Sequence, residues 1–304
     1  MSSDSRLRVE LGTRSYEILI GSGLIADAGR HVRPLAERAI IVTDARVAPL
    51  HLPTLEAAFD RAGITHQAIR LPAGEQTKDF VHLAQLSENL LSRRLERGSL
   101  LVALGGGVIG DITGFAASIL LRGIDFVQIP TTLLAQVDSS VGGKTGINTP
   151  QGKNLVGSFH QPRLVLADLD ALATLPKREI RAGYAEVVKY GLIGDAAFFA
   201  WLEDHGAALV DGEIEARRHA VAVSCAAKAR VVRHLASVGL PTGLDAIDGR
   251  AFAADRLIDH MRRDKKVAQG RIAFVLTRGI GEAFVAKDVA LDEVQDMLAE
   301  AIAA

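Results

Sequence analysis

A glycine-rich turn, Gly105 to Asp111, is the part of the sequence whose residue types and spacing most directly indicate binding chemistry. It has the G-x-G-x-x-G spacing, in which residues without a Cβ atom let the backbone approach a pyrophosphate at the N-terminus of a helix. Glycines also serve ordinary tight turns, so the motif alone is weak. Its position between an apolar run at 99–104 and a helical pattern that continues to about Leu121 favours the phosphates of a nucleotide cofactor.

The acidic partner of this turn departs from the usual dinucleotide site. That site places an acid about 20 residues later, after the next strand, where it binds a ribose. Asp125 is only 15 residues beyond Gly110 and precedes its predicted strand, so it fits poorly. The acid available at the end of a predicted strand is Asp44, earlier in the chain. The turn therefore predicts a variant of the dinucleotide site.

Two lysines lie among glycines and hydroxyl side chains further along the chain. Lys144 is in the run 137–146, and Lys153 is in the run 152–157. A lysine beside accessible backbone N–H groups suits anionic oxygens, so both runs favour binding of a phosphate or a carboxylate. The alternative is two exposed loops that carry solvated lysines.

A second pair of charged residues, Glu186 and Lys189, is spaced three apart, so both side chains share one face of a predicted helix. A surface ion pair is the ordinary interpretation of such a pair. The flanking Val187 and Val188 and two neighbouring tyrosines favour a partly buried face instead.

The elements that must position these residues alternate between strands and helices, which predicts a mostly parallel sheet covered on both faces. A hairpin over 6–11 and 15–20 comes first. Predicted strands follow at 39–42, 64–71, 99–104 and 126–129, with helices at 53–62, 77–95 and after the glycine turn. Because ligands bind at the carboxyl ends of such strands, we expect the loops at Asp44, Glu75, the glycine turn and Thr131–Thr132 to converge on one edge.

The second half is Ala-rich and helix-periodic at 180–193, 196–202 and 214–232. A strand pair at 271–276 and 282–285 and a helix at 291–303 complete it. The predicted fold class is α/β, with an N-terminal Rossmann-like nucleotide-binding domain over 1–160 and a mostly helical C-terminal domain over 161–304.

Composition excludes several function classes. A net charge of −1 with 23% charged residues gives no electrostatic footprint for nucleic acid or an anionic membrane. Cys225 is the only cysteine, so no internal disulfide is expected, and a buried structural thiol is favoured over a nucleophile. Without a signal-peptide pattern or an apolar run long enough to cross a bilayer, a cytoplasmic location is expected.

Six segments carry a resemblance to a known family. In chain order they are PAGEQTK at 72–78, GGGVIGD at 105–111, PTTLLAQVDSSVGGKTGIN at 130–148, GKNLVGSFHQP at 152–162, DLDALATLP at 168–176 and AGYAEVVKYGLI at 182–193. Together they resemble the 3-dehydroquinate synthase family of sugar phosphate cyclases, which acts in the shikimate pathway of aromatic amino acid biosynthesis. The resemblance implies conversion of 3-deoxy-D-arabino-heptulosonate 7-phosphate to 3-dehydroquinate and phosphate, with NAD and a divalent metal, zinc or cobalt, as cofactors.

The resemblance also implies roles for individual residues. Glu186 matches a metal ligand, and Arg122 matches an arginine that reaches the phosphate in a neighbouring subunit, which implies a homodimer. Substrate contacts are implied for Asp138, Lys144, Asn154 and Lys189. NAD contacts are implied for Asp44, Glu75, Lys78, Gly106, Gly107, Asp111, Thr131, Thr132, Lys144, Lys153 and Thr174.

The family's other two metal ligands are histidines, in an Asn-Leu-Gly-His-Thr-Phe-Gly-His segment and a His-Gly-Glu segment, and this chain has neither. A family segment of several dozen residues is missing near 232–233, where the flanks join directly. None of the nine histidines forms a metal-ligand pattern, and Glu186 alone does not make a tight site. Either the segment has been left out of a continuously numbered chain, or it is deleted.

Other interpretations stay open at this point. A different sugar phosphate cyclase would share the NAD loops and the phosphate-binding residues. A glycerol-type, metal-dependent alcohol dehydrogenase shares the architecture, but its substrate has no phosphate for the lysine loops to bind. A non-catalytic NAD-binding protein is the third alternative if the deletion is real. Lys265 and Lys266 resemble a substrate-facing lysine site, and a solvated basic turn is the competing interpretation.

Overall fold

The computed structural model describes residues 5–237, 274–277, 280, 282–286, 289–292 and 294–295. The chain divides into two compact units, which we describe separately. The first contains Met1–Val188 and Trp201–Asp245, and the second contains Lys189–Ala200 and Ala246–Ala304.

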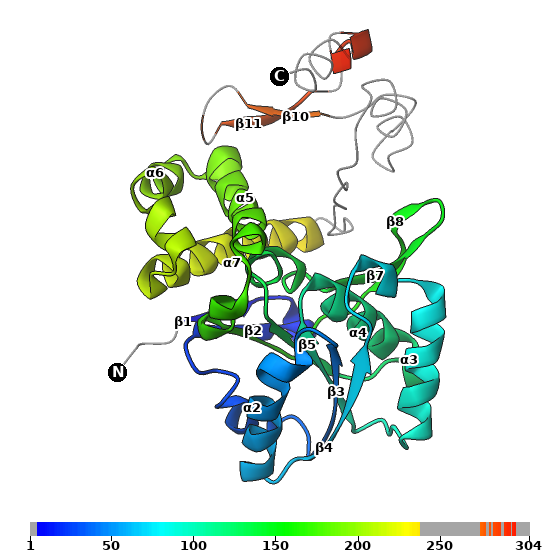
Figure 1. The fold of residues 1–304 in the computed structure, drawn as a ribbon. Helices are drawn as coiled ribbons and strands as arrows, with labels where there is room; N and C mark the ends of the chain where they lie inside the picture. Colours follow the sequence, from blue (N-terminus) through cyan, green and yellow to red (C-terminus); the bar gives the residue numbers. More distant parts are fainter. Residues whose placement is uncertain are drawn as a thin grey trace. The chain divides into compact units, whose positions relative to one another are not determined.

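The first unit is built on a seven-stranded sheet with the order β1-β2-β9-β6-β5-β3-β4. Figure 1 labels β1, β2, β5, β3 and β4 of this sheet. Only β1 and β2 pair antiparallel; every other neighbouring pair in this sheet is parallel. The predicted α/β class and the predicted strands are confirmed. The strands are β1 (Ser5–Val9), β2 (Tyr16–Gly21), β3 (Arg38–Asp44), β4 (Thr65–Leu71), β5 (Leu100–Gly105), β6 (Phe126–Pro130) and β9 (Leu164–Asp168).

Helices cover both faces of this sheet. Helices α1 (Ala28–Val32) and α2 (Ala48–Arg61) pack on one face, and α3 (Phe80–Ser92) and α4 (Gly107–Ile119) pack on the other. Strand β3 shows why its sequence is a continuous apolar run: Ile41 belongs to the core on the α2 side, while Ile40 and Val42 belong to the core on the α4 side.

The structure corrects two predicted helix starts. Helix α2 begins at Ala48 rather than at Pro53, and Pro53 lies inside it. Helix α3 begins at Phe80 rather than at Thr77, because the Asp79 carboxylate accepts a hydrogen bond from the His82 N–H (2.8 Å) and so caps the helix there.

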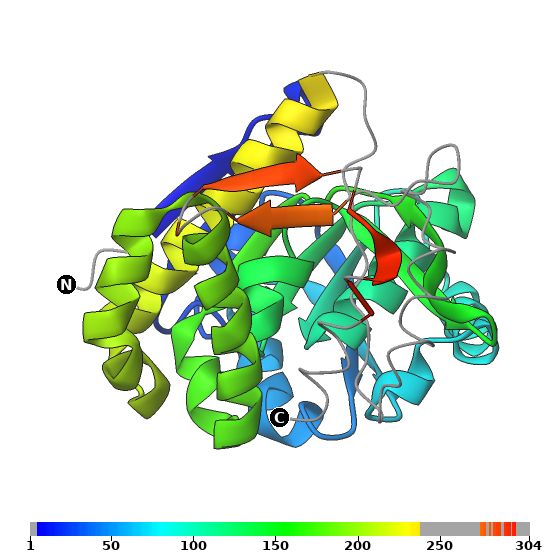
Figure 2. The ribbon, with the colours of Figure 1, turned by 90° about the horizontal axis from the view of Figure 1, so that it is seen from above.

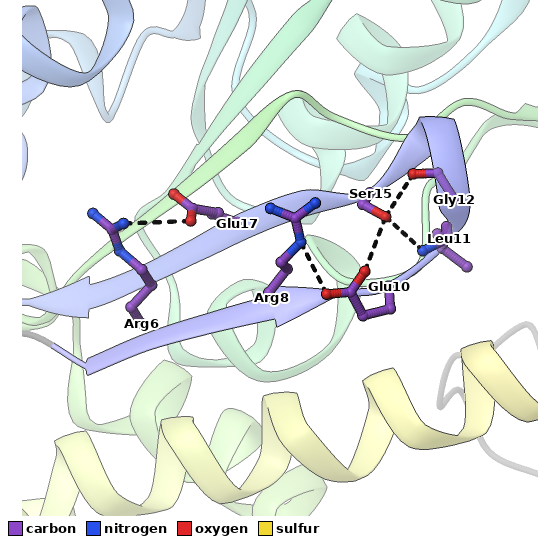
Figure 3. A network of polar contacts seen from close by, with 7 residues as sticks. All are labelled: Arg6, Arg8, Glu10, Leu11, Gly12, Ser15 and Glu17. Carbon is purple, nitrogen blue, oxygen red and sulfur yellow. Dashed lines mark hydrogen bonds and ion pairs between the residues drawn. The ribbon is translucent and has the colours of Figure 1, made fainter.

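The predicted N-terminal hairpin is confirmed, and a 3₁₀ turn at Gly12–Arg14 closes it. The Ser15 hydroxyl donates to the Gly12 carbonyl (2.8 Å) and accepts from the Leu11 N–H (2.9 Å), which fixes the turn (Figure 3). An exposed ion pair between Arg8 and Glu10 (2.9 Å) adds a second contact (Figure 3). Helix α7 (Ile214–Ser237) lies alongside this hairpin (Figure 2).

A second hairpin replaces the two loops expected around Lys144 and Lys153. Strands β7 (Lys144–Thr149) and β8 (Gly152–Phe159) pair antiparallel, with Gly146 directly opposite Gly157. A Cβ atom on Gly157 would lie 2.1 Å from the Thr145 carbonyl oxygen. These two glycines therefore permit the close approach of two strands rather than access to a ligand.

Three long helices follow the sheet: α5 (Lys177–Gly194), α6 (Ala196–Asp211) and α7. The mostly helical character predicted after the nucleotide-binding part is confirmed. Within the described residues, no helix combines the length and the apolar character needed to span a membrane. The sheet includes β9, which lies beyond residue 160, and the division into 1–160 and 161–304 stays a prediction.

In the second unit, β10 (Phe274–Thr277) and β11 (Ala283–Ala286) pair antiparallel, close to the predicted strand pair. Residues 291–292 and 294–295 are helical, and the rest of the helix predicted over 291–303 lies outside the described residues. Lys265 and Lys266 also lie outside them.

Candidate cofactor and substrate site

The carboxyl ends of four neighbouring parallel strands, β4, β3, β5 and β6, form the edge at which the predicted site residues gather. Backbone hydrogen bonds join the loops that follow these strands. The Thr131 N–H donates to the Gly105 carbonyl (3.0 Å), and the Ala45 N–H donates to the Leu71 carbonyl (3.0 Å). The predicted convergence of the four loops is confirmed.

The glycine turn forms a cradle at the start of α4. Gly106 is the N-cap and has no side chain with which to occupy the first N–H groups of the helix. A Cβ atom on Gly107 would lie 3.0 Å from the Ser139 Oγ, and one on Gly106 would lie 3.1 Å from the Thr132 Cγ2. The Thr131 and Ser139 hydroxyl oxygens are buried and have no hydrogen-bond partner within the described residues. Open N–H groups and unpaired hydroxyls at a helix N-terminus fit a phosphate group.

Lys78 and Asp111 pair beside this cradle. The Lys78 ammonium, which is 4% exposed, donates to the Asp111 carboxylate, one turn into α4. Burial raises the pKa of the Asp111 carboxyl from its ordinary value of 3.8 to about 6, and the charge of Lys78 opposes that rise.

Glu75 and Lys153 also come together, although they are 78 positions apart in the sequence. The Lys153 ammonium lies 3.5 Å from the Glu75 carboxylate, and both side chains are partly exposed. This pair links the loop after β4 to the β7–β8 hairpin, and both of its members are predicted NAD contacts.

Asp44 and Thr174 have local structural partners at the same edge. The Asp44 carboxylate accepts from the N–H groups of Arg46 (2.7 Å) and Val47 (3.0 Å), which fixes the turn into α2. The Thr174 hydroxyl, in the 3₁₀ segment Leu169–Thr174, lies 3.1 Å from the His51 Nε2. Burial lowers the pKa of His51. The NAD roles of Asp44 and Thr174 stay predictions.

Asn148 connects the loop after β4 to strand β8 of the β7–β8 hairpin, and it was not among the predicted site residues. Its Nδ2 donates to Glu75 (2.8 Å), its Oδ1 accepts from the Asn154 N–H (3.0 Å), and its own N–H donates to the Lys78 carbonyl (2.7 Å). The only signal for it in the sequence was its place at the end of the KTGIN run, because all three partners are distant or lie across the hairpin.

Asp138 lies in a single π-helical turn, Ala135–Ser139, a type of segment that is frequent at functional sites. Lys228 of α7 donates to the Asp138 carboxylate and, at 2.6 Å, to its backbone carbonyl. Lys228 is a second residue to which the sequence analysis gave no role. In the sequence it is only the single lysine of an Ala-rich helix. Its partner becomes apparent only from the packing of α7 on the π-helical turn.

Asn154 has two features of a strained binding residue. Its backbone φ is 54°, in the left-handed region, and its Oδ1 is buried without a hydrogen-bond partner within the described residues. Lys144 is the first residue of β7 and pairs across the hairpin with Phe159. Lys144 and Asn154, two of the four predicted substrate residues, thus lie on the β7–β8 hairpin.

Arg122 lies at the end of an unusual turn that follows α4. Leu121, Arg122 and Gly123 have φ values of 51°, 68° and 113°, so three consecutive residues are left-handed, and the Arg122 side chain is exposed. Lys189 belongs to the second compact unit, where its ammonium lies 5.3 Å from the centre of the Tyr190 ring. Its place in the substrate site stays a prediction.

The metal that the family resemblance implies does not fit the described residues. Among them, no three His, Cys, Asp or Glu side chains come together in a way that could hold a metal ion. Glu186, half-buried on α5, is the one residue that matches a family ligand. Six histidines have partners of other kinds: His51, His66, His82, His160, His205 and His219 contact hydroxyl, carbonyl, carboxylate or aromatic groups.

Comparisons with known proteins agree with this geometry. A family model described as 3-dehydroquinate synthase N-terminal matches residues 68–182, and one described as 3-dehydroquinate synthase C-terminal matches residues 183–234. A 3-dehydroquinate synthase from Rhodospirillum rubrum is 48% identical, over 98% of this chain and 95% of that protein.

This alignment is longer than the chain. It extends over 367 positions, and because 98% of 304 residues is about 298, about 69 positions hold no residue of this chain. The C-terminal family match ends at residue 234, next to the predicted join. Helix α7 spans residues 232 and 233, so the predicted join lies inside this helix.

Two solved structures show the same fold. A 2-epi-5-epi-valiolone synthase from Streptomyces hygroscopicus, with NAD⁺ and Zn²⁺ bound, has a TM-score of 0.81 and 25% identity, over 97% of each chain. A 2-deoxy-scyllo-inosose synthase in complex with carbaglucose-6-phosphate, NAD⁺ and Co²⁺ has a TM-score of 0.72 and 20% identity, over 97% of this chain and 100% of that chain. With the two family models and the close relative, these findings show that the chain belongs to the 3-dehydroquinate synthase family.

Proposed function

We propose that this chain is an NAD-dependent lyase and cyclase that converts 3-deoxy-D-arabino-heptulosonate 7-phosphate to 3-dehydroquinate and phosphate in the shikimate pathway. The observation that supports this most directly is the cradle at Gly106 and Gly107, which lies at the same sheet edge as the Lys78–Asp111 pair. The R. rubrum relative, which is 48% identical to this chain, is named 3-dehydroquinate synthase after this reaction.

The residues at this edge fit NAD. The open N–H groups of α4 and the unpaired hydroxyls of Thr131 and Ser139 would receive the pyrophosphate. Bound NAD supplies reversible oxidation of a ring hydroxyl, which acidifies the adjacent C–H and allows phosphate to be eliminated. The proposed NAD-binding set is Asp44, Glu75, Lys78, Gly106, Gly107, Asp111, Thr131, Thr132, Lys144, Lys153 and Thr174.

The substrate's anionic groups need fixed positive charge, because charge develops on the phosphate as it leaves. Lys144, Asn154 and Lys189 would bind the phosphate and the carboxylate, and the unpaired Oδ1 of Asn154 would accept from a substrate hydroxyl. Lys228 and Asp138 form a cation–carboxylate pair that can orient a hydroxyl and hold a proton close to it. No step is assigned to a metal, since the described residues do not complete a metal site.

Arg122 supports a homodimer as part of this proposal. Left-handed backbone at two consecutive residues other than glycine, Leu121 and the exposed Arg122, is a costly conformation, and such conformations cluster at functional sites. In the proposed dimer Arg122 contributes charge to the phosphate site of the partner subunit. The proposal also includes a cytoplasmic location.

The test is turnover by the purified chain with NAD and 3-deoxy-D-arabino-heptulosonate 7-phosphate, followed as released phosphate and as 3-dehydroquinate. The R. rubrum relative is the positive control, and the Asp138→Asn variant should lose turnover while NAD affinity is retained. Turnover of another phosphorylated sugar in place of this substrate would support a different cyclase activity. NAD binding without turnover of any of them would overturn the proposal in favour of a non-catalytic NAD-binding protein.

A further inference from the structure

Metal ligands are the part of the family's site that the described residues do not supply. Two structural neighbours of this chain were solved with Zn²⁺ or Co²⁺ beside NAD⁺. A tight site for either ion needs three or more protein ligands that converge, and the described residues of this chain bring no such group together. We infer that the chain has kept the NAD site of its family and has lost tight divalent-metal binding.

The charge at Asp138 supports this inference. The ammonium of Lys228 contacts the Asp138 carboxylate and is 2.6 Å from its backbone carbonyl oxygen. A carboxylate that already pairs with a protonated lysine is a poor ligand for a cation, because the metal would have to displace the lysine or remain close to a like charge. Asp138 is therefore a poor replacement for the metal ligands that the family segment would supply.

The predicted join lies after the residues that form the candidate NAD site. About 69 alignment positions are absent, and the join lies inside α7, which continues to Ser237. The cradle, the Lys78–Asp111 pair and the β7–β8 hairpin all precede residue 160 and have their contacts in the described structure. Loss of the segment can therefore remove metal ligands while the NAD site stays assembled.

The direct test measures metal content and NAD affinity on the same protein. After dialysis against zinc and then against metal-free buffer, the chain should retain less than about 0.1 zinc per chain, as expected for a site weaker than about 1 mM. The NAD dissociation constant should change less than twofold when a chelator is added. The 2-epi-5-epi-valiolone synthase is the positive control for zinc. Retention of one zinc per chain would overturn the inference.

A gain-of-binding experiment gives a second test. Inserting the corresponding segment of the R. rubrum relative between Val232 and Arg233 should restore about one zinc per chain. The further substitution Glu186→Gln should then abolish zinc retention. If the insertion folds, as judged by unchanged NAD affinity, and still binds no zinc, the deleted segment is not the cause and the inference fails.

The inference rests on the proposed function only for the NAD site, and its test can fail separately from that function. Zinc content and NAD affinity are measured without turnover. Turnover that zinc or cobalt does not stimulate supports both proposals. Turnover that requires a retained zinc supports the proposed function and overturns the inference. If the chain retains no zinc and shows no turnover, the inference is supported and the proposed function is overturned.

Discussion

The ammonium of Lys78 donates to the carboxylate of Asp111, and so joins the loop after β4 to the second turn of α4. Both side chains are largely buried, with 5% and 18% exposure. This ion pair fixes the position of the glycine cradle, which follows β5, relative to the loop after β4, two strands away in the sheet. A change at this pair should therefore affect both the stability of the fold and the binding of the cofactor.

Removal of Lys78 should therefore reduce stability and NAD affinity together. We expect Lys78→Met to lower the free energy of unfolding by about 3 kcal/mol, because the Asp111 carboxylate is left buried and unpaired. Denaturant titration measures the loss, and calorimetry should show NAD binding weakened by more than about tenfold, or about 1.4 kcal/mol. Lys177→Met removes an exposed ion pair with Asp211 and should cost less than about 1 kcal/mol. Equal losses in the two variants would contradict the role of burial.

The same pair predicts a pH dependence. The pKa of Asp111 rises from 3.8 to about 6 on folding, so the folded state holds this proton more tightly than the unfolded chain. Its contribution is present below about pH 4 and is lost as the pH rises through 6. The free energy of unfolding of the wild type minus that of Asp111→Asn should fall by up to about 3 kcal/mol between pH 4 and 7. A difference that is flat or rises over this range would show that the pKa is not raised.

The sequence was sufficient to predict this edge of the sheet but not its cross-links. Strands β3, β4, β5 and β6 were predictable because short apolar runs alternate with helical periodicity, and parallel strands place Asp44, Glu75 and the glycine turn on one edge. Strand β9 was missed because the alternation of strands and helices breaks before it, where the β7–β8 hairpin takes the place of a long helix.

The contacts of Asn148 and Lys228 could not be predicted from periodicity. Asn148 bonds to Glu75, 73 positions away, and Lys228 reaches Asp138 across 90 positions. Both depend on how a hairpin or a helix packs on the sheet, and local pattern does not contain that information. The glycines at 146 and 157 show the converse, since their spacing suggested ligand access and their structural role is strand pairing.

A side chain on Gly107 should close the cradle. In Gly107→Ala the new methyl group lies about 3.0 Å from the Ser139 Oγ and occupies space beside the open N–H groups. We expect NAD affinity to fall about tenfold with little loss of stability, since alanine is the better helix former. Gly98→Ala is the matched control, because a Cβ atom there meets nothing within 4 Å. An NAD affinity that is unchanged in Gly107→Ala, or that falls equally in Gly98→Ala, would contradict the role of the cradle.

Asn148 should act as a positioning residue for both halves of the site. Asn148→Ala removes its side-chain bonds to Glu75 and Asn154, and we expect NAD affinity to fall about five- to tenfold, as for the loss of one to two hydrogen bonds. Asn148→Asp keeps the acceptor for the Asn154 N–H but repels the Glu75 carboxylate. NAD binding should therefore weaken in both variants, whereas the KM for the substrate should rise only in Asn148→Ala. Asn89→Ala, which loses one exposed bond to the Gln85 carbonyl, is the control; a similar effect there would remove the argument.

Cys225 should report whether α7 stays packed on the turn that carries Asp138. Its thiol is fully buried, its Sγ donates to the Gln136 carbonyl (3.2 Å), and burial raises its pKa to about 12. The thiolate that reacts with aromatic disulfide reagents is therefore scarce at pH 8, and the reagent has no access to it. We expect the folded chain to react at least about a hundredfold more slowly than the unfolded chain, in which one thiol per chain should be labelled. Rapid labelling of the folded protein would mean that α7 separates from the π-helical turn in solution, and the Lys228–Asp138 contact could not then persist.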